Sequence, residues 1–122
     1  MISSLREMLH EHPELRVAGD ASDGLQAIAR AHALRPDVIL MDVSMPIMNG
    51  VEATRRIRAE LPSVQIFGIS VDAPTNGPHP IEEAGATRFF VKGADTQRLI
   101  DELIVVHRTM NTDSLSRRRS IV

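Results

Sequence analysis

The chain has 122 residues, 43% of them hydrophobic and 25% charged, with a formal net charge of −2. This length suits one domain with a single core, and no apolar run approaches the ~18 residues that a transmembrane helix needs. The absence of cysteine excludes disulfides and thiolate metal sites. The small net charge argues against nucleic-acid binding by the body of the domain. We therefore expect a cytoplasmic protein without a membrane segment.

The first half of the chain alternates between helical and strand patterns. It begins with a helix over about residues 3–12 and a short strand over residues 15–18. Ser22 then caps a second helix, whose inner face we expect to include Leu25. The next strand, at residues 38–41, is an unbroken apolar run, which is typical of a buried parallel strand.

The second half continues the alternation. The elements predicted there are a helix after Gly50, a strand at 64–69, a stub of helix at 81–84, a strand at 88–91 and a last helix from Asp95 or Thr96. Residues 71–80 contain three prolines and Gly77, so we expect a loop. Such alternation implies an α/β fold, in which helices cover both faces of a parallel sheet.

Three of the predicted strands end on polar side chains, Asp42, Ser70 and Lys92. Because the carboxyl ends of parallel strands share one edge, a carboxylate, a hydroxyl and an ammonium can converge there. This set suits phosphoryl transfer to the carboxylate, with the aspartate as nucleophile and the other two groups stabilising phosphoryl oxygens. Lys92 is the single lysine beside 13 arginines, which strengthens the interpretation.

Several segments together carry a family pattern. They are Gly19–Gly24, Pro36–Asp42, Met45–Gly50, Ala53–Arg58, Ile69–Ser70, Ala84–Ala86 and Phe89–Lys92. With them the chain resembles the receiver domain of bacterial two-component response regulators, in the subfamily that precedes a helix-turn-helix DNA-binding domain. The resemblance covers about residues 3–107. It implies a flavodoxin-like (CheY-like), doubly wound parallel sheet in three layers.

The resemblance also implies roles for individual residues. Asp42 would accept a phosphoryl group from a histidine kinase, Ser70 would bind a phosphoryl oxygen, and Lys92 would pair with the phosphate. Phe89 matches an aromatic position that moves on phosphorylation. Asp42 and the backbone carbonyl of Ser44 match ligands of a Mg²⁺ cofactor. The implied function is that of a phosphorelay signalling domain, with no enzymatic activity beyond slow gain and loss of its own phosphoryl group.

One part of the family pattern is missing from this sequence. Family receivers begin with a strand that ends in two acidic residues, whereas this chain starts at the first helix, so we expect an incomplete metal site. In the family strand order, 2-1-3-4-5, that strand is internal. Its absence would let strand 15–18 pair directly with strand 38–41, leave a gap, or invite a partner chain through strand exchange or a homodimer.

The domain limits and the competing function follow from the same observations. We expect a receiver domain over residues 1–109 and a disordered, basic polar tail over residues 110–122, which carries Arg117, Arg118 and Arg119. The alternative function is a degenerate receiver that binds partners independently of phosphorylation, through its last helix and the edge of strand 88–91. The five histidines show no metal-binding spacing with acids, and we expect them on the surface.

Overall fold

The computed structural model describes residues 7, 9, 11, 12, 15, 17–72, 77–110 and 120–121, with the backbone alone for residues 107–110 and 120–121. The helix expected over residues 3–12 therefore lies largely outside the described residues. Leu9, which belongs to it, is helical and fully buried. Its burial agrees with the apolar face that the sequence predicts for this segment.

The elements alternate along the chain as the sequence predicts. In order they are β1 (Val17–Gly19), α2 (Gly24–Leu34), β2 (Val38–Asp42), α3 (Gly50–Glu60), β3 (Gln65–Ser70), α4 (Pro80–Glu83), β4 (Arg88–Val91), α5 (Thr96–Met110) and β5 (Ser120–Ile121).

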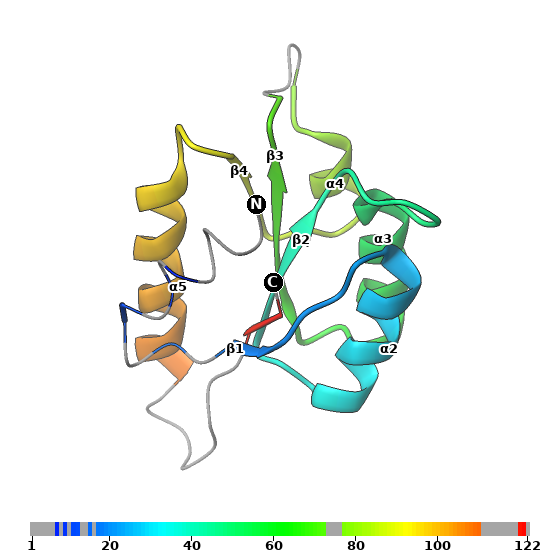
Figure 1. Ribbon diagram of the computed structural model, residues 1–122, viewed down its shortest axis with the longest axis horizontal. Coiled ribbons are helices and arrows are strands. Elements are labelled where there is room, and N and C mark those ends of the chain that lie inside the picture. The colour runs from blue at the N-terminus through cyan, green and yellow to red at the C-terminus, as the bar shows by residue number, and fades with distance from the viewer. Residues whose placement is uncertain are drawn as a thin grey trace.

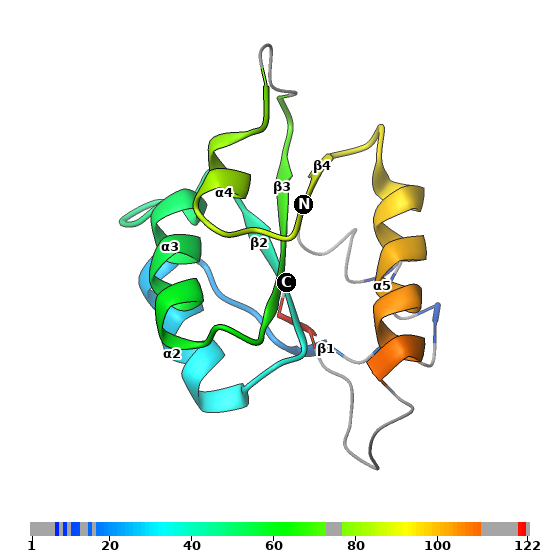
Figure 2. The ribbon, with the colours of Figure 1, turned by 180° about the vertical axis from the view of Figure 1, so that it is seen from behind.

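The strands form one parallel sheet in the order β1-β5-β2-β3-β4. Helices α2, α3 and α4 cover one face and α5 the other, so the molecule has three layers (Figures 1 and 2). Each face has its own apolar cluster, with Ile39, Ile57 and Ile66 on the first side and Phe67, Phe90 and Leu103 on the second. The prediction of a flavodoxin-like, CheY-like sheet is confirmed.

Strand β5 lies between β1 and β2, the internal position that the family strand order gives to its first strand (Figure 1). Ser120 pairs with Val17 on one side and with Val38 on the other. Two of the outcomes considered from the sequence, direct pairing of the flanking strands and a gap, are therefore wrong, because β5 occupies the place. The third, a partner chain through strand exchange or a homodimer, stays a prediction. The expectation of a disordered tail is also wrong for Ser120 and Ile121, whereas residues 111–119 and 122 lie outside the described residues. Backbone N–H and C=O groups left unpaired on this edge of β2 would cost free energy, and pairing with β5 offsets part of that cost.

Helix α2 meets the sheet through small residues. Its buried residues are Gly24, Ala27 and Ala31, and Leu25 is half exposed, so the prediction that Leu25 lies on the inner face is wrong. The cap is Asp23 instead of Ser22, because the Asp23 Oδ1 atom accepts a hydrogen bond of 2.9 Å from the amide of Gln26. A Cβ atom at position 24 would lie 2.3 Å from the carbonyl oxygen of Met48, so only glycine lets α2 pack this closely.

The contact between α2 and Met48 places the loop that follows β2. The amide of Gly24 donates to the carbonyl of Met48 at 2.9 Å, and the amide of Gly50 donates to the carbonyl of Val43 at 3.0 Å. A Cβ atom at position 50 would lie 2.1 Å from the carbonyl oxygen of Asp42. Residues 43–50 are thus folded back against the end of β2, which fixes the backbone around Asp42.

Candidate phosphoryl-transfer site

Asp42 and Lys92 form an ion pair at the carboxyl edge of the sheet. Asp42 is the last residue of β2, and Lys92 directly follows β4. The Lys92 Nζ atom lies 2.9 Å from Asp42 Oδ2, with side-chain exposures of 18% for Lys92 and 22% for Asp42. The two residues are thus partly shielded from water but still accessible, a setting in which a charge pair is stronger than on an open surface.

The second carboxylate oxygen of Asp42 is held by its own loop. The amide of Ser44 donates to Asp42 Oδ1 at 2.9 Å. A backbone donor on one oxygen and an ammonium on the other orient the carboxylate. Ser44 therefore contacts Asp42 through its amide, which the sequence did not indicate; its carbonyl was the group singled out there.

Ser70 ends β3, the strand between β2 and β4. It is buried, and its Oγ atom accepts a hydrogen bond of 3.2 Å from the amide of Asp72. A hydroxyl that accepts in this way keeps its own hydrogen for donation. The carbonyl of Ser70 accepts from the amide of Lys92 at 2.8 Å, so the backbones of these two residues are joined directly.

The turn after Lys92 is fastened by Asp95. Its Oδ2 atom accepts from the amide of Val91 at 2.8 Å, and its amide donates to the carbonyl of Val91 at 2.9 Å. These two hydrogen bonds close the turn that leads the chain from β4 into α5. The sequence predicted Asp95 only as a possible start of the last helix.

Phe89 lies on β4, three residues before Lys92, and is half buried. Its ring stacks on the ring of His79, with centroids 4.4 Å apart and 10° between the planes. His79 was expected only as a surface residue, and its sequence neighbours, Pro78 and Pro80, gave no sign of this contact. The stack depends on the loop before α4 returning to β4, which is a tertiary feature.

The loop between β2 and α3 carries a strained, exposed residue. Ile47 has a φ of 68° and is 78% exposed. A β-branched residue is rarely found in this left-handed region, because its Cβ substituents crowd the backbone. The strain lies five residues after Asp42, within the loop whose Ser44 amide holds the carboxylate.

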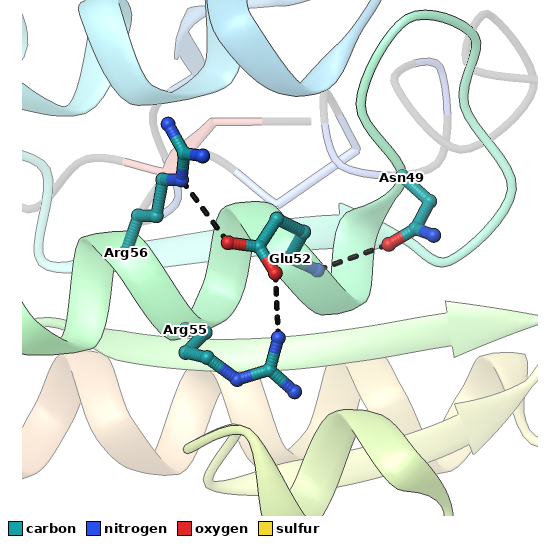
Figure 3. Close-up of polar contacts among 4 residues, drawn as sticks. All are labelled: Asn49, Glu52, Arg55 and Arg56. Carbon is teal, nitrogen blue, oxygen red and sulfur yellow. Dashed lines mark hydrogen bonds and ion pairs between the residues drawn. The ribbon is translucent and has the colours of Figure 1, made fainter.

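Near the start of helix α3, next to this loop, one carboxylate contacts two arginine side chains (Figure 3). Asn49 caps the helix, its Oδ1 atom accepting from the amide of Glu52 at 2.9 Å. The carboxylate of Glu52 then accepts from Arg56 at 3.1 Å and from Arg55 at 2.6 Å. The hydrogen bond from Arg56, helped by Arg55, lowers the pKa of Glu52 below its ordinary value.

The described residues do not fit a Mg²⁺ site by themselves. Mg²⁺ needs near-octahedral oxygen ligands, and the described part of the chain holds no group of three or more His, Asp or Glu side chains able to bind a metal ion. Both oxygens of Asp42 are already engaged by protein donors. The carboxylate of Asp23 is engaged as the cap of α2.

Comparison with known proteins identifies relatives of this arrangement. A family model described as the response regulator receiver domain matches residues 1–104. A protein-glutamate methylesterase/protein-glutamine glutaminase of Bordetella avium is 61% identical over 61 residues, which are 50% of this chain and 18% of that protein. The transcriptional regulatory protein DegU of Brevibacillus brevis is 34% identical over 102 residues, 84% of this chain and 43% of that protein.

A solved structure of a response regulator domain is similar to this chain as well. The response regulator domain of Thermotoga maritima CheB matches with a TM-score of 0.75 and 30% sequence identity, over 93% of this chain and 90% of that one. The chain belongs to the response regulator receiver family, whose members are signalling domains of two-component systems. It spans less than half the length of the two curated relatives above. None of the helices in the described part of the chain is long and apolar enough to cross a bilayer.

Proposed function

We propose that Asp42 is the phosphoacceptor of this receiver domain and takes its phosphoryl group from a histidine kinase. The observation that carries the proposal is the pair of contacts on its carboxylate, with Lys92 Nζ 2.9 Å from Oδ2 and the Ser44 amide 2.9 Å from Oδ1. A carboxylate so oriented at an accessible sheet edge is prepared for attack on phosphorus.

The transfer is a displacement at phosphorus. A carboxylate oxygen of Asp42 forms the new P–O bond, the P–N bond of the kinase phosphohistidine breaks, and the electron pair of that bond returns to the imidazole. Lys92 offsets the negative charge brought by the phosphoryl group. Ser70, whose Oγ already accepts from the Asp72 amide, donates its hydroxyl hydrogen to a phosphoryl oxygen.

The signal would then pass from the edge of the sheet to a partner surface. Capture of a phosphoryl group by Ser70 and Lys92 pulls on the ends of β3 and β4, and Phe89 of β4 responds by changing its ring position. Relatives that include a transcriptional regulatory protein support control of transcription as the output. Such an output would operate in the cytoplasm, where the kinase domain and DNA are accessible.

Phosphorylation can be tested with a small phosphodonor such as acetyl phosphate in the presence of Mg²⁺. Intact mass spectrometry should detect one added phosphoryl group, which hydroxylamine removes because it is an acyl phosphate. The Asp42→Asn variant should gain none. Asp101→Asn, which changes an exposed carboxylate on α5, is the matched control and should be modified like the unaltered protein.

Two results would contradict the proposal. Phosphorylation that persists in Asp42→Asn would place the acceptor elsewhere. No adduct in the unaltered protein, even at high donor concentration, would exclude phosphoacceptance by this chain and favour the phosphorylation-independent interaction module.

A further inference from the structure

The side chain of Asp95 binds the strand before it instead of the helix after it. Asp95 directly precedes α5, and its carbonyl accepts a hydrogen bond of 2.9 Å from the amide of Leu99, at the start of the helix. An aspartate at this position usually accepts from an amide in the first turn of its helix. Here the Oδ2 atom accepts from the amide of Val91 at 2.8 Å. The carboxylate thus holds the residue that precedes Lys92.

Val91 lies on the outer edge of the sheet. Strand β4 is the last in the sheet order of the described strands and pairs there with β3. The amide of Lys92 donates to the carbonyl of Ser70 on β3 at 2.8 Å. Because successive amides of a strand point to opposite sides, the amide of Val91 points away from β3, toward the edge. An edge amide lacks a neighbouring strand to receive it, and the Asp95 carboxylate takes that place.

Both sequence neighbours of Lys92 are therefore bound by the start of α5. Asp95 holds Val91, and the amide of Gly93 donates to Thr96 Oγ1 at 3.1 Å. Gly93 has a φ of 83°, in the left-handed region, so the chain turns directly after Lys92. With the Lys92 amide bound to β3, the backbone is tied at this residue and on both sides of it.

Arg98 contacts the other oxygen of the Asp95 carboxylate. Its Nη1 atom lies 3.7 Å from Asp95 Oδ1, and its Nη2 atom donates to the carbonyl of Phe89 at 3.5 Å. The guanidinium also lies over the ring of Phe90, 5.2 Å from the centroid. The carboxylate of Asp95, which is 25% exposed, is thus held between a strand amide and a cation that itself contacts β4.

We propose that Asp95 is a positioning residue for Lys92: by binding the Val91 amide, it holds the lysine backbone where the ammonium reaches Asp42. The Lys92 side chain has many rotamers, so its contact of 2.9 Å with Asp42 Oδ2 depends on where the backbone starts. The effect on phosphoryl transfer rests on the proposed phosphoacceptor role of Asp42. The effect on the ion pair exists in the unphosphorylated protein.

Lys92 is the only lysine of the chain, so its side chain can be observed alone. Protein that contains lysine labelled with ¹³C at Cε gives one methylene signal in NMR. Its two protons differ when the ammonium is held and become equivalent when it is free. Asp42→Asn removes the partner charge and defines the signal of the free side chain. Asp95→Ala removes the acceptor of the Val91 amide and should move the signal toward that of Asp42→Asn.

Asp95→Asn separates the hydrogen bond from the charge. The asparagine carbonyl still accepts from the Val91 amide but carries no charge, so the lysine signal should stay close to that of the unaltered protein. Asp101→Ala removes a carboxylate of the same helix, which contacts Gln97, and is the matched control. Far-UV circular dichroism checks that each variant is folded at the temperature of the measurement.

The second readout is the rate of Asp42 phosphorylation by acetyl phosphate with Mg²⁺. Asp95→Ala should slow it about tenfold, because a misplacement of ~1 Å can cost a reaction up to ~100-fold. Asp95→Asn should restore most of the rate, and Asp101→Ala should leave it unchanged.

The outcomes separate the two proposals. An unmoved lysine signal in Asp95→Ala would overturn the positioning role. Equal shifts in Asp95→Ala and Asp95→Asn would overturn it too, because the carboxylate would then act through its charge. If the unaltered protein gains no phosphoryl group while Asp95→Ala alone still shifts the lysine signal, the positioning of Lys92 holds and the proposed phosphoacceptor role of Asp42 fails.

Discussion

The ion pair between Asp42 and Lys92 should contribute more to stability than an exposed pair of the same type. Two unit charges 2.9 Å apart attract by about 6 kcal/mol at an effective dielectric constant of ~20, before the cost of desolvation is subtracted. Pairs on open surfaces retain ~0.2–1 kcal/mol. With about four fifths of both side chains shielded, we expect a net coupling of about 1–2 kcal/mol, between the surface and buried limits.

A double-mutant cycle measures this coupling. The free energy of unfolding is determined for the unaltered protein, Asp42→Asn, Lys92→Met and the double variant, by urea titration followed with far-UV circular dichroism, because the chain has no tryptophan or tyrosine. The pair Arg88–Glu102, with a contact of 2.9 Å and Arg88 59% exposed, is the matched surface control. A coupling for Asp42–Lys92 no larger than that of the control pair would refute the reasoning.

Three further predictions concern the support of the site. Thr54 Oγ1 is buried with no hydrogen-bond partner among the described residues. Thr54→Val should therefore raise the free energy of unfolding, measured by urea titration, by about 1 kcal/mol. A lower free energy of unfolding in this variant would mean that the hydroxyl has a partner. The pKa of Glu52, lowered by Arg56 and Arg55, should rise toward its ordinary value in Arg56→Gln in a ¹³C NMR titration. Because the folded pKa of Glu52 is lower than its unfolded pKa, the stability gained from Glu52 is present above the unfolded pKa and is lost as pH falls through the folded value. An unchanged titration of Glu52 in Arg56→Gln would exclude the contact between Arg56 and Glu52 in solution. Ile121→Pro removes a backbone donor from an internal strand and should lower the free energy of unfolding by about 1–3 kcal/mol, and unchanged stability would exclude β5 from the sheet.

The positions of Asp42, Ser70 and Lys92 could be predicted because each ends an apolar run of strand length. Such a run fixes a buried parallel strand, and a parallel sheet brings its strand ends to one edge. The ion pair between Asp42 and Lys92 follows from that topology. The sequence therefore contained enough information to place Asp42 and Lys92 together at one edge of the sheet.

Other features could not be predicted because their signals are not local. The inner face of α2 is built from Gly24, Ala27 and Ala31, whose small side chains add little to an apolar pattern, while the exposed Leu25 adds much. The glycine at position 24 reflects the close approach of Met48, which belongs to another segment.

The strand β5 and the His79–Phe89 stack were missed for a related reason. Two residues in a polar segment have no periodicity that could indicate a strand, and their pairing depends on the space between β1 and β2. The stack likewise depends on how the loop before α4 returns to β4. In both cases the partner is distant in sequence, and only the folded chain brings the two together.

The placement of β5 also bears on whether the stability of the sheet and the position of Asp42 depend on the same contacts. Within the described part of the chain, β2 pairs with β3 over all five residues from Val38 to Asp42, but with β5 only at Val38 and Ile39. The backbone at Asp42 is thus set by β3 and its carboxylate by the Ser44 amide, away from the residues that pair with β5. Ile121→Pro should therefore reduce stability while leaving the rate of Asp42 phosphorylation unchanged at temperatures where the variant is folded. A parallel loss of both would mean that the β5 side of the sheet also positions the phosphoacceptor.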